Sequence, residues 1–83
     1  MTYVDGNAIA GLLREVFDEE LTAAVSTCGT CGEVAVVAEL RVYLRCPGAV
    51  VRCPRCGAVL VRIAEIRGLH VVDLGGLRDL ARA

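Results

Sequence analysis

The first apolar pattern in the chain has the spacing of a helix with one buried face. Hydrophobic residues recur at positions i, i+3, i+4, i+7 and i+8, namely Ile9, Leu12, Leu13, Val16 and Phe17. Asp5 or Asn7 can cap the start of this helix, and the acidic run at 18–20 opposes the helix dipole, so the helix should end there. We therefore predict an N-terminal amphipathic helix over residues 5–19.

From Leu21 onward the pattern changes to short β-branched runs separated by glycine and proline, which favours strands. Within residues 38–45 apolar and polar residues alternate, so that Leu40, Val42 and Leu44 share one face. The expected strands cover residues 21–27, 34–45, 49–52, 58–67 and 69–74. Together they predict an antiparallel sheet.

The turn signals and the chain length set the predicted organisation. Pro47 and Gly48 indicate a tight turn, which makes a hairpin that joins the cysteine pair at 28–31 to the cysteine pair at 53–56. A chain of 83 residues predicts one domain, 1–83. Its parts are the helix (5–19), the sheet (21–75) and a final segment (76–83) that we expect to be a short helical turn or a frayed tail.

Two cysteine pairs in this sheet share one spacing. Each pair is a Cys-x-x-Cys turn followed directly by glycine: Cys28, Cys31 and Gly32, then Cys53, Cys56 and Gly57. Two such turns supply four thiolates for a tetrahedral metal ion, and a glycine with positive φ lets backbone N–H groups point at the sulfurs. The 21 residues between the pairs are a gap that a hairpin fills. The sequence therefore predicts a tetrathiolate metal site.

Cysteine pairs also serve as redox switches and disulfides. A dithiol switch needs only one exposed pair, which would leave the second pair unexplained. A disulfide scaffold belongs to oxidising compartments, and five cysteines cannot all pair with one another. The opening MTYVDGNAIAG lacks the basic region and apolar run of a secretory signal, so we expect a cytoplasmic protein. No apolar run is long enough for a membrane span.

Composition changes the picture in two ways. Nine arginines against ten acidic residues give the chain a formal charge of -1. Four thiolates that bind one divalent ion would add a charge of -2, for a total of -3. A negative total charge disfavours a nucleic-acid-binding protein. The hydrophobic content of 55% and the mean hydropathy of +0.58 are high for so small a domain. We therefore expect apolar surface that contacts a partner protein or a second copy.

Four residues outside the ligand set also carry chemistry. Cys46 stands at the predicted hairpin turn, and we interpret it as an ordinary free cysteine and not as a ligand. His70 is the only histidine, and a lone histidine on a strand is more often structural. Arg52 and Arg55 lie beside and inside the second cysteine pair, where they either damp thiolate reactivity or are solvated surface residues.

The segments CGTCGE and CPRCGAVL are similar to the metal-binding knuckles of the zinc-ribbon and rubredoxin-like folds. YVDGNAIAGLL, RCPRCGAVLVR and DLGGLR resemble, over nearly the whole chain, a family of short bacterial proteins classed as a domain of unknown function. The resemblance implies a bacterial cytosolic protein with a zinc-ribbon core and no stated activity. The chain lacks the several aromatic rings of rubredoxin-like electron carriers, so zinc is favoured over iron.

These observations predict an α+β fold, a small zinc-ribbon antiparallel sheet with an N-terminal amphipathic helix. We expect a non-catalytic binding or accessory module, since no phosphate loop or nucleophile with a base is recognisable. Its structural zinc ligands would be Cys28, Cys31, Cys53 and Cys56. The alternatives are a one-iron electron carrier with the same ligands and a nucleic-acid-binding ribbon with an arginine stripe formed by Arg41, Arg45, Arg52 and Arg62.

Overall fold

The computed structural model describes residues 3–18, 20–45 and 48–81. Its helical elements are η1 (Gly6–Ile9), α1 (Ala10–Phe17) and η2 (Val37–Glu39), of which α1 is an α-helix and the others are 3₁₀ turns. The strands are β1 (Val4–Asp5), β2 (Val25–Cys28), β3 (Val34–Val36), β4 (Arg41–Arg45), β5 (Gly48–Arg52), β6 (Val59–Ile66), β7 (Leu69–Asp73) and β8 (Leu77–Ala81). The fold is α+β, as the sequence predicts.

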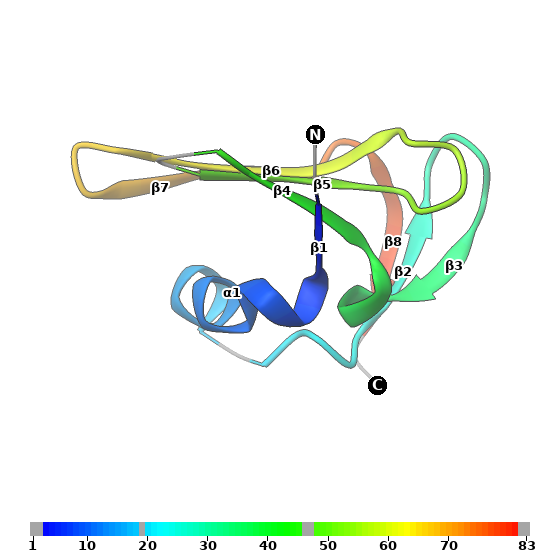
Figure 1. Ribbon diagram of the computed structural model, residues 1–83, viewed down its shortest axis with the longest axis horizontal. Helices are drawn as coiled ribbons and strands as arrows, with labels where there is room; N and C mark the ends of the chain where they lie inside the picture. The colour runs from blue at the N-terminus through cyan, green and yellow to red at the C-terminus, as the bar shows by residue number, and fades with distance from the viewer. Residues whose placement is uncertain (1–2, 19, 46–47, 82–83) are drawn as a thin grey trace.

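The strands form two antiparallel sheets (Figure 1). The larger sheet has the order β1-β4-β5-β6-β7, and the smaller one has the order β3-β2-β8. The larger sheet extends over α1, while the smaller one stands at the opposite end of the molecule from that helix (Figure 1). The predicted hairpin is formed by β4 and β5, with Arg45 opposite Gly48; Pro47 lies outside the described residues.

The predicted N-terminal helix is confirmed, but it is shorter than residues 5–19. The chain first makes η1, and Asp5 occupies its N-cap position without a side-chain capping hydrogen bond. Asn7 lies inside η1, and the residue before α1 is Ile9, so the predicted side-chain cap by Asp5 or Asn7 is wrong. The helix ends at Phe17 because Asp18 adopts a left-handed backbone conformation with φ 58°. No helix in the described residues is long and apolar enough to cross a membrane.

The prediction of a helical turn or frayed tail at the C-terminus is wrong. Residues 77–81 form β8, which pairs with β2. Leu77 and Leu80 both pack on the core although they are three residues apart, a spacing typical of a helix. The spacing arises because the register shifts between Thr27 and Cys28 of β2, as at a β-bulge, so one extra residue of β8 fits between the two leucines.

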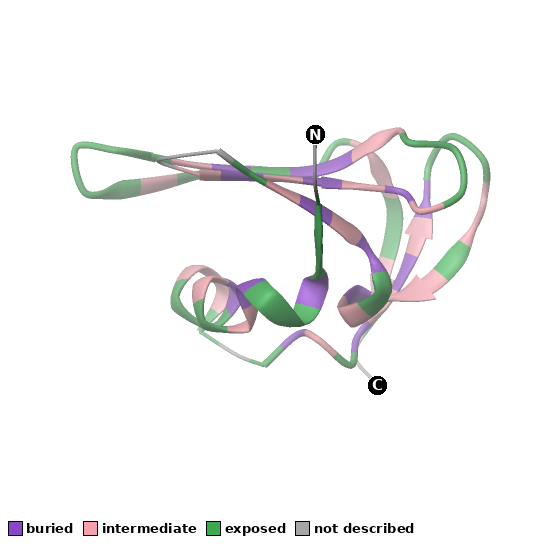
Figure 2. Cartoon of the chain, viewed as in Figure 1, coloured by how far each residue is buried: buried purple, intermediate pink, exposed green. Residues whose placement is uncertain are grey.

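The two sheets and α1 share one apolar core. Ile9 and Leu13 contribute from the helical segment, and buried positions recur along β4, β5 and β6 (Figure 2). The predicted apolar face of residues 38–45 is interrupted, because η2 breaks the strand and Leu44 is 61% exposed at the far end of β4. The core is thus concentrated where α1 and both sheets meet.

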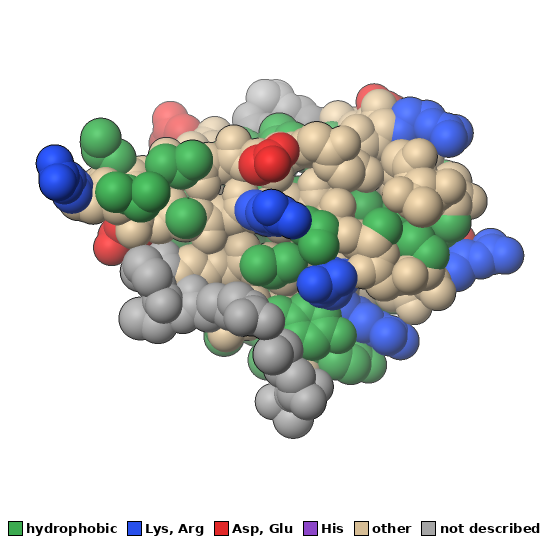
Figure 3. Space-filling view, turned by 90° about the horizontal axis from the view of Figure 1, so that it is seen from above, with side chains coloured by type: hydrophobic (Ala, Val, Ile, Leu, Met, Phe, Trp, Pro, Cys, Tyr) green, Lys and Arg blue, Asp and Glu red, His purple; other side chains and the backbone are tan. Residues whose placement is uncertain are grey.

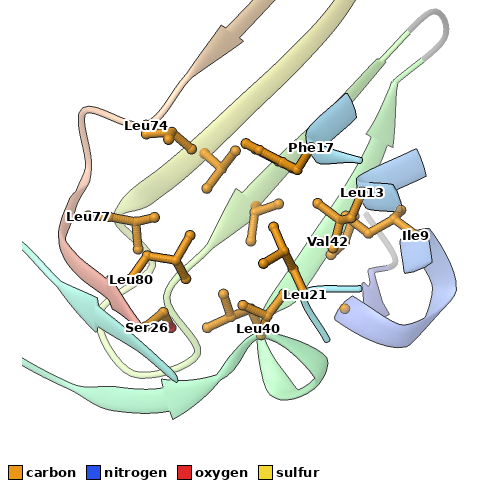
Figure 4. A pocket seen from close by; sticks show the side chains of 14 residues that line it. Ile9, Leu13, Phe17, Leu21, Ser26, Leu40, Val42, Leu74, Leu77 and Leu80 are labelled. Carbon is orange, nitrogen blue, oxygen red and sulfur yellow. The ribbon is translucent and has the colours of Figure 1, made fainter. Parts of the chain in front are cut away.

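A cavity of about 20 Å³ remains inside this core (Figure 4). Leucines of the C-terminal segment, Leu74, Leu77 and Leu80, face side chains of α1 and β4 across it (Figure 4). Ser26 also lines it, and its Oγ donates to the carbonyl oxygen of Ala35 at 2.8 Å. A gap of this size holds about one water at most, so it is a packing defect and not a ligand site.

Candidate metal centre

Each cysteine pair occupies the turn of a β-hairpin. Cys28 ends β2 and its turn leads into β3, while Cys53 directly follows β5 and its turn leads into β6. The two hairpins belong to different sheets, and their turns lie together at one end of the molecule (Figure 1). A ligand held by both turns would therefore connect the two sheets.

The same backbone hydrogen bonds close both turns. The N–H of the glycine donates to the carbonyl of the first cysteine, at 3.1 Å in the first turn and 3.0 Å in the second. The N–H of the first cysteine donates to the carbonyl of the residue after the glycine, at 2.9 Å in both turns. Gly32 and Gly57 both have φ 79°, so the predicted positive φ is confirmed at each.

The four sulfur atoms converge on one point. All four Sγ atoms lie within 4.8 Å of one another, and none of these cysteines forms a disulfide. Two sulfur pairs span the turns, Cys28 with Cys56 at 3.7 Å and Cys31 with Cys53 at 3.6 Å. A tetrahedral ion with metal–sulfur distances of about 2.3 Å requires sulfur–sulfur distances of about 3.8 Å. The four cysteines could therefore hold one metal ion.

Backbone N–H groups point at the sulfurs in both turns. Three sulfurs accept a hydrogen bond from the N–H two residues further on: Cys28 from Thr30 at 3.4 Å, Cys53 from Arg55 at 3.4 Å and Cys56 from Ala58 at 3.5 Å. The N–H of Cys31 also donates to Cys28 Sγ, at 3.5 Å. These donors stabilise negative charge on sulfur, the form that binds a cation.

The two thiols of the first turn differ in acidity. The hydrogen bond from the backbone N–H of Cys31, helped by the one from Thr30, lowers the pKa of Cys28 to about 6 although burial opposes it. A hydrogen bond from the backbone of Glu33 also acts to lower the pKa of Cys31, but burial and the neighbouring thiols outweigh it and raise that pKa to about 12. The hydrogen bonds of the first turn thus favour negative charge on Cys28, and a bound cation would favour ionisation of the other thiols.

The centre is buried on one side and open on the other. The first cysteine of each pair, Cys28 and Cys53, is 1% exposed, whereas Cys31 and Cys56 are exposed. The buried cysteines belong to the apolar core, so the position of the sulfurs depends on core packing. The exposed pair gives an ion a route in from solvent.

The C-terminal segment supports the first turn, which sequence reasoning missed. The N–H of Gly29 donates to the carbonyl of Gly76 at 2.9 Å, and Leu77 pairs with Cys28. A Cβ at Gly76 would lie 1.8 Å from the carbonyl oxygen of Val59, beside the second turn. The two glycines before Leu77, Gly75 and Gly76, were the signal in the sequence for this contact, because two backbones can approach so closely only at a glycine.

Arg52 supports the second turn through its backbone. Its guanidinium donates to the carbonyl of Gly57 at 2.8 Å and lies 5.7 Å from the ring centroid of Tyr43. Arg55 is exposed. The sequence left two interpretations of these arginines: they lower the reactivity of the thiolates, or they are solvated surface residues. Neither describes Arg52, because its side chain holds the shape of the turn.

The predicted arginine stripe lies on the sheet face turned away from α1. Arg41 is directly opposite Arg52, and Arg62 shares their face because it is opposite Val50. The Arg41 guanidinium lies 4.8 Å from the centroid of the Tyr3 ring, so Arg41 and Arg52 each lie over a tyrosine. The side chain of Arg45 is outside the described residues.

Two other candidates lie apart from the sulfur cluster. His70 is on β7, where its Nε2 lies 3.7 Å from Glu65 Oε2, and within the described residues the metal-ligand cluster contains only the four cysteines. This contact agrees with the structural interpretation of His70. Cys46 lies outside the described residues, so its interpretation as a free cysteine stays a prediction.

Fold and site together define a small α+β protein with antiparallel sheets and a four-cysteine centre suited to a metal ion. Residues 1–83 match the model of a family of unknown function, DUF6510, and the chain belongs to that family. The comparisons with curated proteins and with solved structures give no match. The resemblance to a domain of unknown function is confirmed, and the family supplies no activity.

Proposed function

We propose that the protein is a non-catalytic zinc-ribbon module in which one Zn²⁺ connects the two sheets. The ligands would be Cys28, Cys31, Cys53 and Cys56. The observation that carries the proposal is the convergence of four sulfurs from two identically closed turns, at spacings that fit a tetrahedral thiolate ion. A domain of this size has a small core, so a metal cross-link contributes directly to its folding.

Zinc supplies structural stabilisation without redox chemistry. Four thiolates complete its tetrahedral shell and leave no position for substrate or water, which supports a binding role and not a catalytic one. Iron in the same four sulfurs would make an electron carrier, and the metal decides between these two functions. The Arg41 and Arg52 side chains already lie over tyrosine rings, so a nucleic-acid partner is not needed to explain them.

The proposed partner is another protein surface or a second copy of the chain, in a cytoplasmic setting. Exposed apolar surface supports this partner. Because the core is small, eight large hydrophobic side chains of the described residues are exposed, among them Leu69 and Ile66. Zinc would fix the turns and sheets that present this surface.

Metal analysis of the purified protein tests this function. The protein is produced in cells supplied with both zinc and iron, and the metal content is measured together with the visible spectrum. We expect about one zinc per chain and a colourless protein. One iron per chain, with a red oxidised form that dithionite bleaches, would replace the structural role with electron transfer.

A further inference from the structure

Exposed apolar side chains gather at the end of the larger sheet that lies farthest from the cysteines. Ile66, Leu69 and Val71 are 55%, 72% and 53% exposed. Ile66 is directly opposite Leu69 in the β6–β7 hairpin, so all three lie on the face turned away from α1. Figure 3 looks onto this face and shows hydrophobic side chains crowded at the hairpin end. We call these three residues the hairpin patch.

The hairpin patch adjoins an open sheet edge. β7 is the last strand of the five-stranded order, and among the residues that the structure describes it pairs only with β6. Natural edge strands usually carry lysine, proline or an inward-pointing charge that blocks pairing with another chain. β7 (Leu69–Asp73) has no lysine, arginine or proline, and its one acidic residue, Asp73, is at its end. The edge is therefore unprotected along its centre.

The hairpin turn fixes which backbone groups face this edge. Arg67 and Gly68 have φ 52° and 79°, as in a two-residue type I′ turn. Such a turn makes Ile66 and Leu69 a hydrogen-bonded pair, and hydrogen-bonded and non-hydrogen-bonded pairs alternate from there. The N–H and C=O groups of His70 and Val72 consequently point to the free edge.

We propose that two copies of the protein form a dimer in which β7 pairs with β7 of the second copy. An antiparallel pairing of a strand with itself is two-fold symmetric, so each copy uses the same surface. In one register the free N–H and C=O groups of His70 and Val72 all form hydrogen bonds, because His70 of each copy pairs with Val72 of the other. This register places Val71 of one copy directly opposite Val71 of the other. This inference deepens the proposed function by naming the protein that the module contacts.

Charge placement favours a second copy over an unrelated strand. In this register Asp73 of one copy lies opposite Leu69 of the other, so Arg67 of that copy, two residues before Leu69, is its diagonal neighbour across the interface. Within its own chain Asp73 is opposite Arg62. One oxygen of Asp73 accepts a hydrogen bond from the N–H of Gly75 at 2.8 Å, and the carboxylate keeps a second oxygen for the arginine. The hairpin patches of the two copies then become continuous across the symmetry axis.

The dimer surface and the metal centre are separable by experiment. β6 is eight residues long; it begins beside the second cysteine turn and ends at the hairpin turn. A strand of that length spans roughly 25 Å. A substitution in the middle of β7 should therefore leave metal binding unchanged, so the two proposals can fail independently.

The first test is the solution mass of the zinc-loaded protein and of two variants. The wild-type chain of 8.8 kDa should sediment as a dimer of 2 × 8.8 = 17.6 kDa. Val71→Lys places two like charges directly opposite each other and should raise the dimer dissociation constant about 100-fold or more. Val34→Lys is the matched control, because Val34 is an equally exposed valine (59%) on β3, at the edge of the other sheet. It should dimerise like the wild type.

Hydrogen exchange of single amides tests the register. In the dimer the amides of His70 and Val72 should be protected, and in Val71→Lys they should exchange rapidly while those of Leu69 and Val71 stay bonded to β6. A monomeric wild type at millimolar concentration overturns the proposal, as does a dimer that Val34→Lys dissociates and Val71→Lys does not. Rapid exchange at His70 and Val72 in the wild-type dimer excludes this pairing. Zinc content per chain should be equal in all three proteins.

Discussion

Replacing the glycine of a cysteine turn by alanine should weaken the fold by a conformational cost alone. Gly57 has φ 79°, and a Cβ built there meets no atom within 4 Å. The cost is therefore that of a left-handed conformation in a residue with a Cβ, about 1–2 kcal/mol. For a domain of this size each kcal/mol lowers Tm by about 4–8 °C. Gly57→Ala should thus melt roughly 4–16 °C below the wild type.

Two other glycines provide matched controls. Gly11 lies inside α1 with no atom within 4 Å of its added Cβ, and Gly11→Ala should stabilise the protein by about 0.5–1 kcal/mol. A Cβ at Gly76 would lie 1.8 Å from a backbone oxygen, so Gly76→Ala should be far more damaging than Gly57→Ala. Gly57→Asn should recover part of the loss, because asparagine enters the left-handed region more readily.

Circular dichroism melts at a fixed free zinc concentration measure these differences, because ligand binding itself shifts Tm. The expected order of Tm is Gly11→Ala, wild type, Gly57→Asn, Gly57→Ala and Gly76→Ala. An unchanged Tm for Gly57→Ala would contradict the positive φ at this turn. If Gly57→Ala lowered Tm as much as Gly76→Ala does, other atoms would have to fill the space beside Gly57.

Three further predictions concern the cysteines, pH and the core. Cys31→Ser or Cys53→Ser should lose zinc and give insoluble or molten protein, because metal binding is largely folding free energy here; a normally folded Cys31→Ser with full zinc content would disprove the ligand assignment. Since protons compete with zinc for the thiolates, zinc affinity should fall as the pH is lowered, and a chelator competition that shows equal affinity at pH 5 and pH 8 would contradict thiolate ligation. Ser26→Ala removes the buried hydrogen bond to Ala35 and should cost about 1 kcal/mol in denaturant unfolding, whereas no loss would show that this bond contributes nothing.

The sequence predicts the two cysteine turns well because the geometry of each turn is local. A Cys-x-x-Cys-Gly turn carries both its ligands and the residue that bends the backbone, so the φ of Gly32 and Gly57 follows from the residue types. The apolar spacing of residues 9–17 likewise finds α1 from local information. In both cases neighbouring residues determine the structure.

The errors fall where distant segments decide the structure. Leu77 and Leu80 have helical spacing, and only pairing with β2 through a register shift makes their segment a strand. The smaller sheet, with the order β3-β2-β8, likewise joins segments that are far apart in the sequence, whereas the local pattern predicts a single sheet. η1 takes the place of the first turn of the predicted helix, and Gly6 lies against η2, where its added Cβ would be 1.9 Å from the Val37 carbonyl oxygen.

X-ray absorption at the zinc edge tests whether four cysteines hold the metal, since it counts the ligand atoms around the ion and measures their distances. We expect four sulfur ligands at about 2.3 Å in the wild-type protein. We also expect that no nitrogen or oxygen ligand takes part. A shell with nitrogen or oxygen, or with fewer than four sulfurs, would contradict a zinc ion held by Cys28, Cys31, Cys53 and Cys56.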